Sequence, residues 1–193
     1  MFDDRIPVVL PLAMGAAVDS PHLALKAEAM TVRALAQRLI DRLPVVGAPV
    51  LDFGVYSAGA GAGLFSAICT ALVRELVHRL RTAGGRRFVL LADGAAASTL
   101  TALTAEDLLI VEVGRTGRAA ERLLEAPEKD RARERLTSIL LGVDPRAVRM
   151  KRLETTSPAS AFKGERLLEA RTEDVMATIM ARWPDLAASR MRN

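Results

Sequence analysis

Short apolar runs alternate with amphipathic helical segments along the 193-residue chain, and this alternation restricts the fold more than any other feature. Apolar runs that suit strands occur at residues 6–12, 49–56, 87–91 and 108–113. Apolar residues at helical spacing predict helices at residues 24–43, 65–80, 135–141 and 163–183. Strands that alternate with helices in this way favour right-handed crossover connections. The sequence therefore predicts an α/β protein with three α/β/α layers and a mainly parallel sheet.

The composition supports one buried core. Half of the residues are hydrophobic and 26% are charged, which places the chain among globular proteins. We expect a single domain over residues 1–186 and a frayed tail over residues 187–193. Cys69 is the single cysteine of the sequence, so neither an internal disulfide nor a thiolate zinc cluster can form. A cytoplasmic location is the expectation that follows from this cysteine usage.

Charge and aromatic content narrow the range of partners. The net charge of +4 is modest, and the aromatic content of 4% is too low for a stacking platform on nucleic acid. No apolar run approaches the roughly 20 residues that cross a bilayer. These features argue against a nucleic-acid partner and against a membrane partner. A small molecule is the ligand that we expect.

The carboxyl ends of the predicted strands are the expected place for that ligand, because helix-covered parallel sheets bind ligands there. Polar or small residues at or near these ends are the candidates for a ligand pocket: Asp19, Ser20, Tyr56, Gly61 and Gly94. The Gly/Ala loop at residues 57–63 precedes a helix, as phosphate-binding loops do, but no Lys-Ser or Lys-Thr pair follows it. A tight loop beside the pocket is the favoured interpretation, and an anion at the start of the helix is the alternative.

Four segments, in order, resemble the creatininase (creatinine amidohydrolase) family. The first runs from the strand at 8–12 through Pro21-His22-Leu23 to Glu28, and it is similar to a family stretch that contains Glu-x-His-Gly-Pro-His-Leu-Pro-Leu. The other three lie at residues 71–91, 132–138 and 163–170. The resemblance covers nearly the whole chain. It implies a creatininase-like fold and, in the family, a hydrolytic centre with two metal ions.

Compared with the family pattern, this sequence lacks most of the metal ligands. The first-motif Glu falls on Ala16 or Ala17, and the His of an Asn-Gly-His triplet falls on Gly94 or Ala95. The resemblance places carboxylates at the remaining ligand positions, namely Asp19, Glu28 and Glu134. Oxygen ligands alone suit Mg²⁺ or Mn²⁺ better than Zn²⁺. We therefore expect either no metal cofactor, with these three as ordinary charged residues, or one hard divalent cation.

These departures predict a degenerate creatininase-like protein without hydrolytic activity, which binds a small molecule or serves as a scaffolding subunit. The resemblance also implies a homo-oligomer, with an active paralogue as a further partner. The alternative is a divergent enzyme that acts on a C–N bond of a small cyclic amide with one carboxylate-bound cation. In such an enzyme Asp93, at a strand end, and His22 would transfer protons. For His22, a hydrogen-bonded turn near the pocket mouth is the other interpretation.

Overall fold

The computed structural model of the chain describes residues 5–14, 20–52 and 62–186. Within these ranges, five strands form one sheet in the order β2-β1-β4-β5, and β3 also pairs with β1. The strands are β1 (Val8–Ala13), β2 (Val46–Gly47), β3 (Leu51–Asp52), β4 (Phe88–Ala92) and β5 (Leu108–Glu112). Every pairing is parallel, as the sequence predicts.

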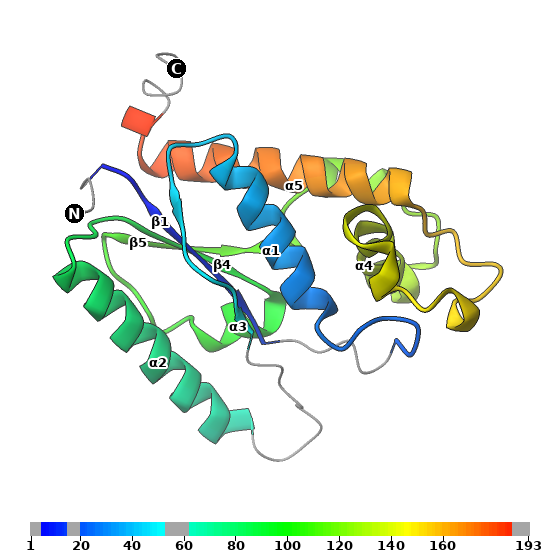
Figure 1. Cartoon of the computed structure of the whole chain (residues 1–193), viewed down its shortest axis with the longest axis horizontal. Helices are drawn as coiled ribbons and strands as arrows, with labels where there is room; N and C mark the ends of the chain where they lie inside the picture. Colours follow the sequence, from blue (N-terminus) through cyan, green and yellow to red (C-terminus); the bar gives the residue numbers. More distant parts are fainter. Residues whose placement is uncertain (1–4, 15–19, 53–61, 187–193) are drawn as a thin grey trace.

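Helices cover both faces of this sheet (Figure 1). The helices α1 (Ala27–Ile40) and α5 (Ala161–Arg182) lie on one face. The helices α2 (Ala62–Thr82) and α3 (Gly94–Thr99) lie on the other. Side chains of β1 reach both layers because successive residues of a strand point to opposite faces: Val9 joins the first cluster, and Leu10 joins the second. The predicted three-layer α/β/α architecture is confirmed.

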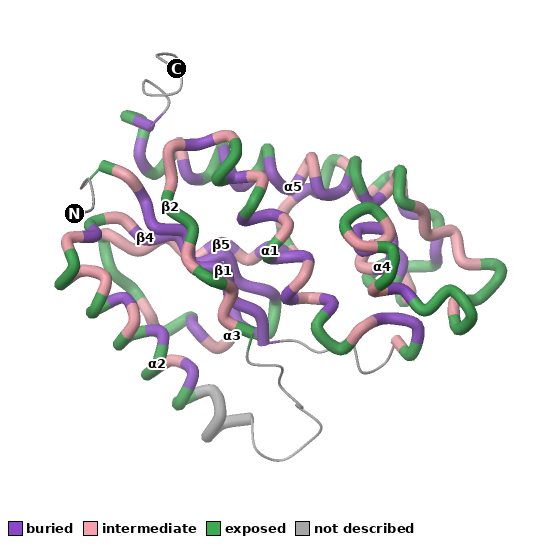
Figure 2. The backbone as a smooth tube through the Cα atoms, in the orientation of Figure 1, coloured by how far each residue is buried: buried purple, intermediate pink, exposed green. Residues whose placement is uncertain are grey.

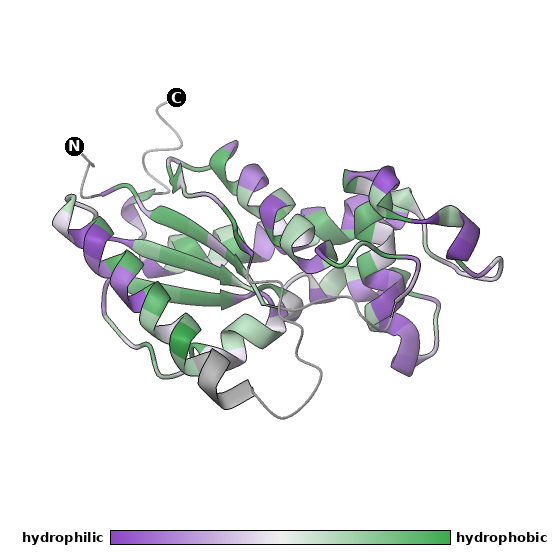
Figure 3. Cartoon of the chain, turned by 60° about the horizontal axis from the view of Figure 1, so that its bottom comes forward, coloured by the Kyte–Doolittle hydropathy of each residue, from purple (hydrophilic) through white to green (hydrophobic). Residues whose placement is uncertain are grey.

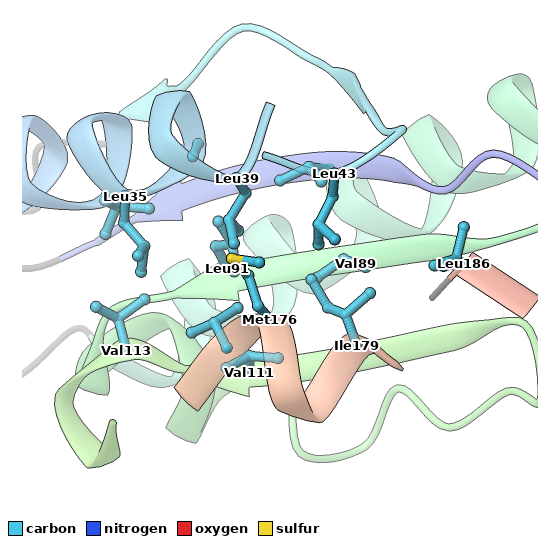
Figure 4. Packing of buried hydrophobic residues seen from close by; sticks show 14 of the residues in the cluster. Leu35, Leu39, Leu43, Val89, Leu91, Val111, Val113, Met176, Ile179 and Leu186 are labelled. Atoms are coloured by element: carbon cyan, nitrogen blue, oxygen red, sulfur yellow. The ribbon is translucent and has the colours of Figure 1, made fainter. Parts of the chain in front are cut away.

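The two central strands, β1 and β4, are buried at every position, whereas β2, β3 and β5 are partly buried or exposed at most positions (Figure 2). Figure 4 shows the packing on the α1 side of the sheet: Leu39 of α1 points toward Leu91 of β4, Leu35 points toward Val113, and Ile179 of α5 lies beside Val89. Each fully buried side chain of this size contributes roughly 1.5–3 kcal/mol of hydrophobic free energy. Burial on both faces explains why β1 and β4 appear in the sequence as continuous apolar runs.

A second, smaller assembly lies beyond the carboxyl edge of the sheet and is built around α4 (Arg131–Val143). Figure 3 shows that this part is more hydrophilic than the sheet. The helix α4 packs closely against the start of α5, where Gly164 leaves no room for a Cβ: a methyl group there would overlap the Ser138 carbonyl and lie 2.8 Å from the Ile139 nitrogen. An isolated antiparallel bridge between Leu23 and Val148 fastens the segment before α1 to this assembly.

Most element boundaries agree with the sequence analysis to within a few residues, with four differences. The helix predicted from residue 24 begins at Ala27. The strand predicted at 49–56 is described as Leu51–Asp52, and residues 53–56 lie outside the described ranges. The two-residue β2 and the six-residue α3 were not predicted. The tail at 187–193, expected to fray, also lies outside them. In the described ranges, no helix combines the length and apolar character that crossing a bilayer would need.

Candidate functional site

Asp93 follows β4 at the carboxyl edge of the sheet and fixes the local backbone. Its Oδ1 accepts the Ala96 N–H at 2.7 Å, which caps the start of α3. Its Oδ2 accepts the Met14 N–H at 2.8 Å, just beyond β1. One buried carboxylate therefore holds the ends of two adjacent strands and the first turn of a helix together. The proton-transfer role predicted for Asp93 stays a prediction.

A cavity of about 100 Å³ opens beside Asp93, and we call it the sheet-edge pocket. Its polar lining consists of Glu28 from the first turn of α1, Asp93, Arg135 from α4 and Arg171 from α5. Gly94 and Gly114 complete the wall at the ends of β4 and β5. The pocket thus lies where a parallel sheet is expected to bind ligands. Two of its residues, Arg135 and Arg171, were not among the predicted site residues.

Arg171 is the more buried of the two arginines of this pocket, with 5% of its surface exposed. Burial, with added repulsion from Arg135, lowers the pKa of Arg171 to about 10, against the attraction of Glu28 and Glu121. The guanidinium therefore stays charged at neutral pH. Within the described part of the chain it makes neither a hydrogen bond nor an ion pair shorter than 4.0 Å. Such a side chain is exceptional, since buried charges are usually paired.

Glu28 and Arg135 face the same cavity from opposite helices. Desolvation, followed by the nearby Asp93 carboxylate, raises the pKa of Glu28 above its usual value, while Arg171 and Arg135 oppose that rise. Arg135 donates from Nη2 to Glu121 Oε1 at 2.7 Å. Its Nε is buried and has no hydrogen-bond partner among the described residues. The pocket is therefore lined by an arginine with one N–H donor that the described residues leave unmatched.

A second, larger cavity of about 640 Å³ lies on the far side of α4, and we call it the His22 pocket. Its lining includes His22, Arg133, Glu134, Thr137 and Glu154. His22 is 5% exposed, and its Nε2 lies 2.8 Å from Thr137 Oγ1. Burial and the Arg133 charge lower the pKa of His22, while Glu154 acts in the opposite direction. The imidazole is therefore a neutral, hydrogen-bonded group at pH 7.

Glu134 lies at the bottom of the His22 pocket and is fully engaged there. Its Oε1 is 2.8 Å from Lys163 Nζ, and its Oε2 accepts the N–H groups of Glu125 at 2.9 Å and Ala126 at 2.8 Å. Desolvation acts to raise the pKa of Glu134, but these contacts outweigh it and hold the pKa below its ordinary value. The carboxylate that the resemblance assigns to a metal thus fastens α4 to α5.

The predicted site residues separate into three groups in the structure. Glu28, Asp93 and Gly94 come together in the sheet-edge pocket, whereas His22 and Glu134 belong to the His22 pocket. Ser20 lines neither of these two cavities; its carbonyl accepts the Leu23 N–H at 2.8 Å in a turn. The remaining candidates lie outside the described ranges: Asp19, Tyr56 and Gly61. Among the residues that are described, no group of three His, Cys, Asp or Glu side chains is placed to hold a metal ion.

Fold and pockets together define a three-layer α/β/α protein whose candidate site lies at the carboxyl edge of a parallel sheet. The family model for creatinine amidohydrolase (creatininase) matches residues 18–185, so the chain belongs to the creatininase family. The predicted family membership is confirmed.

Solved creatininase structures share the fold at low sequence identity. A creatinine amidohydrolase (creatininase) structure superposes with a TM-score of 0.69 and 16% identity, covering 93% of this chain and 91% of that one. A mutant creatininase complexed with creatine gives a TM-score of 0.67 and 14% identity, covering 94% and 93% of the two chains. Identity this low supports the fold alone. A search of curated proteins finds no match.

Proposed function

We propose that this chain is a creatininase-family protein without the di-metal centre, which binds a small molecule in the sheet-edge pocket and does not hydrolyse it. The observation that carries the proposal is Arg171, a buried guanidinium that shares this small cavity with Glu28. A divalent cation bound by Glu28 would lie in a cavity that already holds the fixed positive charges of Arg171 and Arg135. Repulsion between a bound cation and these two guanidinium groups would be strong in so small and buried a cavity.

The donor set of the described residues also fits a pair of metal ions poorly. Glu28 and Glu134, which the resemblance assigns to neighbouring ligand positions, line different cavities. Glu134 already contacts an ammonium group and two backbone N–H groups. Gly94, one of the two positions that replace the family His, has no side chain to coordinate a metal. These points support a binding protein over a two-metal hydrolase.

Metal analysis combined with an activity assay tests the proposal. We expect protein purified and incubated with Zn²⁺, Mn²⁺ or Mg²⁺ to retain far less than one equivalent of metal. We also expect no hydrolysis of small cyclic amides above the level of a Glu28→Ala variant. Stoichiometric metal, together with hydrolysis that disappears in Glu28→Ala while the fold is intact, would establish the single-cation enzyme instead. Light scattering of the same preparation tests the proposed homo-oligomer, which a monomeric mass would contradict.

A further inference from the structure

The sheet-edge pocket contains two guanidinium groups with unused donors. Arg171 has no hydrogen bond or close ion pair within the described residues, and the Nε of Arg135 has no partner there either. Both side chains line the same cavity of about 100 Å³. Leaving a buried charged donor unmatched is unfavourable, whereas an anion placed between two guanidinium groups would satisfy both.

Neighbouring groups constrain the positions of these two side chains. Gly117 has a left-handed φ of +72°, and a Cβ there would lie 2.6 Å from Arg171 Cγ. The backbone at Gly117 therefore packs closely against the aliphatic part of the Arg171 side chain. The Gly117 N–H donates to Asp174 Oδ2 at 2.7 Å, which holds this loop on α5. Arg135 is anchored by Glu121 at 2.7 Å. The unused donors are therefore prearranged, which lowers the entropic cost of binding a ligand.

We propose that the sheet-edge pocket binds a small monoanionic carboxylate between the guanidinium groups of Arg171 and Arg135. A planar carboxylate matches the forked donors of arginine. The cavity volume admits a ligand of only a few heavy atoms. Glu28 and Asp93 line the other side of the cavity, so a dianion such as phosphate would be repelled more strongly than a monoanion. This assignment of a ligand class rests on the function proposed above, because bound metal ions would occupy the same space.

Thermal unfolding in added formate or acetate tests the assignment, with chloride at matched ionic strength as reference and inorganic phosphate as a competing anion. We expect the Tm of the wild type to rise saturably with formate or acetate, and to rise less with phosphate. Isothermal titration with the same anions gives the stoichiometry, expected to be one per chain. No saturable rise, or an equal rise with phosphate, would overturn the monoanionic carboxylate.

Substitutions of Arg171 test whether the rise of the Tm with acetate comes from binding in the sheet-edge pocket. Arg171→Met removes a buried unpaired charge while keeping an apolar side chain, so we expect a folded protein whose Tm no longer responds to acetate. Arg171→Lys keeps the charge without the fork and should weaken acetate binding by about tenfold or more. Arg79→Met, at an exposed arginine paired with Glu75, is the matched control and should respond like the wild type. An undiminished response in both Arg171 variants would contradict the proposal.

The same preparation distinguishes a failure of this inference from a failure of the proposed function. Metal-free, inactive protein that does not respond to acetate would reject the carboxylate while leaving the non-hydrolytic role in place. Metal-loaded, hydrolytic protein would reject the proposed function and, with it, this ligand.

Discussion

Lys163 Nζ lies 2.8 Å from Glu134 Oε1 and joins two segments that are 29 residues apart in the sequence. The side chains are 12% and 1% exposed, so the pair is shielded from water. Lys163 also contacts Glu125 Oε1 at 2.7 Å and the Pro158 carbonyl at 2.9 Å. The third and fourth segments that resemble the family, residues 132–138 and 163–170, thus meet in this contact, so both contribute to holding α4 and α5 together.

Glu134→Gln tests whether the Glu134–Lys163 contact stabilises the fold. The substitution keeps an acceptor for the backbone N–H groups but removes the charge opposite Lys163. Breaking a buried ion pair typically costs about 3–5 kcal/mol, and because Lys163 keeps Glu125 and Pro158 we expect a loss of about 2–3 kcal/mol in urea unfolding. Glu75→Gln, which breaks the exposed Glu75–Arg79 pair, is the control and should cost less than about 0.5 kcal/mol. Equal effects of the two variants would refute a stabilising role for the buried pair.

The Glu134 contribution should depend on pH. Because the folded pKa of Glu134 is lowered, its stabilisation is complete above the unfolded pKa, about 4.3 for a glutamate, and is lost as the pH falls through the folded value. Unfolding free energies of the wild type and of Glu134→Gln should therefore converge below about pH 4. A difference that is constant from pH 7 to pH 3 would show that the charge of Glu134 is not responsible.

Gly164→Ala should disrupt the contact between α4 and α5. The added methyl would overlap the carbonyl group of Ser138, which is backbone and cannot rotate away. We expect a loss of about 3 kcal/mol or more in unfolding free energy. Gly94→Ala is the matched control, since the nearest atom to its new Cβ is Glu112 Oε1 at 3.8 Å. That variant should be neutral or gain up to about 1 kcal/mol, as alanine favours a helix over glycine.

His22 should titrate below the ordinary histidine pKa of about 6.5 when its ring resonances are followed by NMR. Because the folded state resists protonation of His22, stability should decrease as the pH falls below about 6.5 and level off below the folded pKa. His22→Gln should remove this part of the pH dependence. At pH 8, Thr137→Val should cost about 1 kcal/mol through loss of the hydrogen bond to Nε2. A titration midpoint at or above 6.5 would contradict the desolvated environment.

Glu28→Gln should stabilise the protein at neutral pH. The folded pKa of Glu28 is raised by burial and by Asp93, so ionised Glu28 opposes folding at pH values above its unfolded pKa. Glutamine keeps the shape without the charge. The advantage of the variant should be present at pH 7–8, should diminish as the pH falls towards about 4.3, and should be absent below it, where Glu28 is protonated in both states. A destabilised variant at pH 8 would indicate instead that the negative charge of Glu28 is needed beside Arg171.

The fold was predictable because its determinants are local and apolar. The run over β1 is buried at every position, and α1 repeats apolar residues at helical spacing. The helix α3 was missed because its sequence, Gly-Ala-Ala-Ala-Ser-Thr, has no amphipathic period. Asp93 could have indicated this helix, because aspartate is one of the residues preferred at a helix N-cap. Its carboxylate there accepts the backbone N–H of the residue three positions later, which here is Ala96.

The site was less predictable because its residues meet only in three dimensions. Glu28, Asp93 and Gly94 were predicted site residues and do come together, but Glu134 does not join them. The partner of Glu134, Lys163, lies too far along the sequence for any spacing rule. Arg171 did leave a signal that the sequence analysis overlooked. It occupies the buried stripe of α5 between Leu168 and Val175, where a charged residue is out of place unless it has a function.

The absence of a side chain at Gly164 sets how closely α4 and α5 approach each other, about two helical turns from Arg171. The backbones of α4 and α5 are in direct contact at Gly164, with no side chains between them. The distance between the helices that carry Arg135 and Arg171 therefore depends on this backbone contact. Substitutions on the solvent side of either helix should leave the width of the opening unaltered. A new ligand preference would therefore arise by exchanging the side chains that line the pocket, because the contact at Gly164 fixes the spacing of α4 and α5.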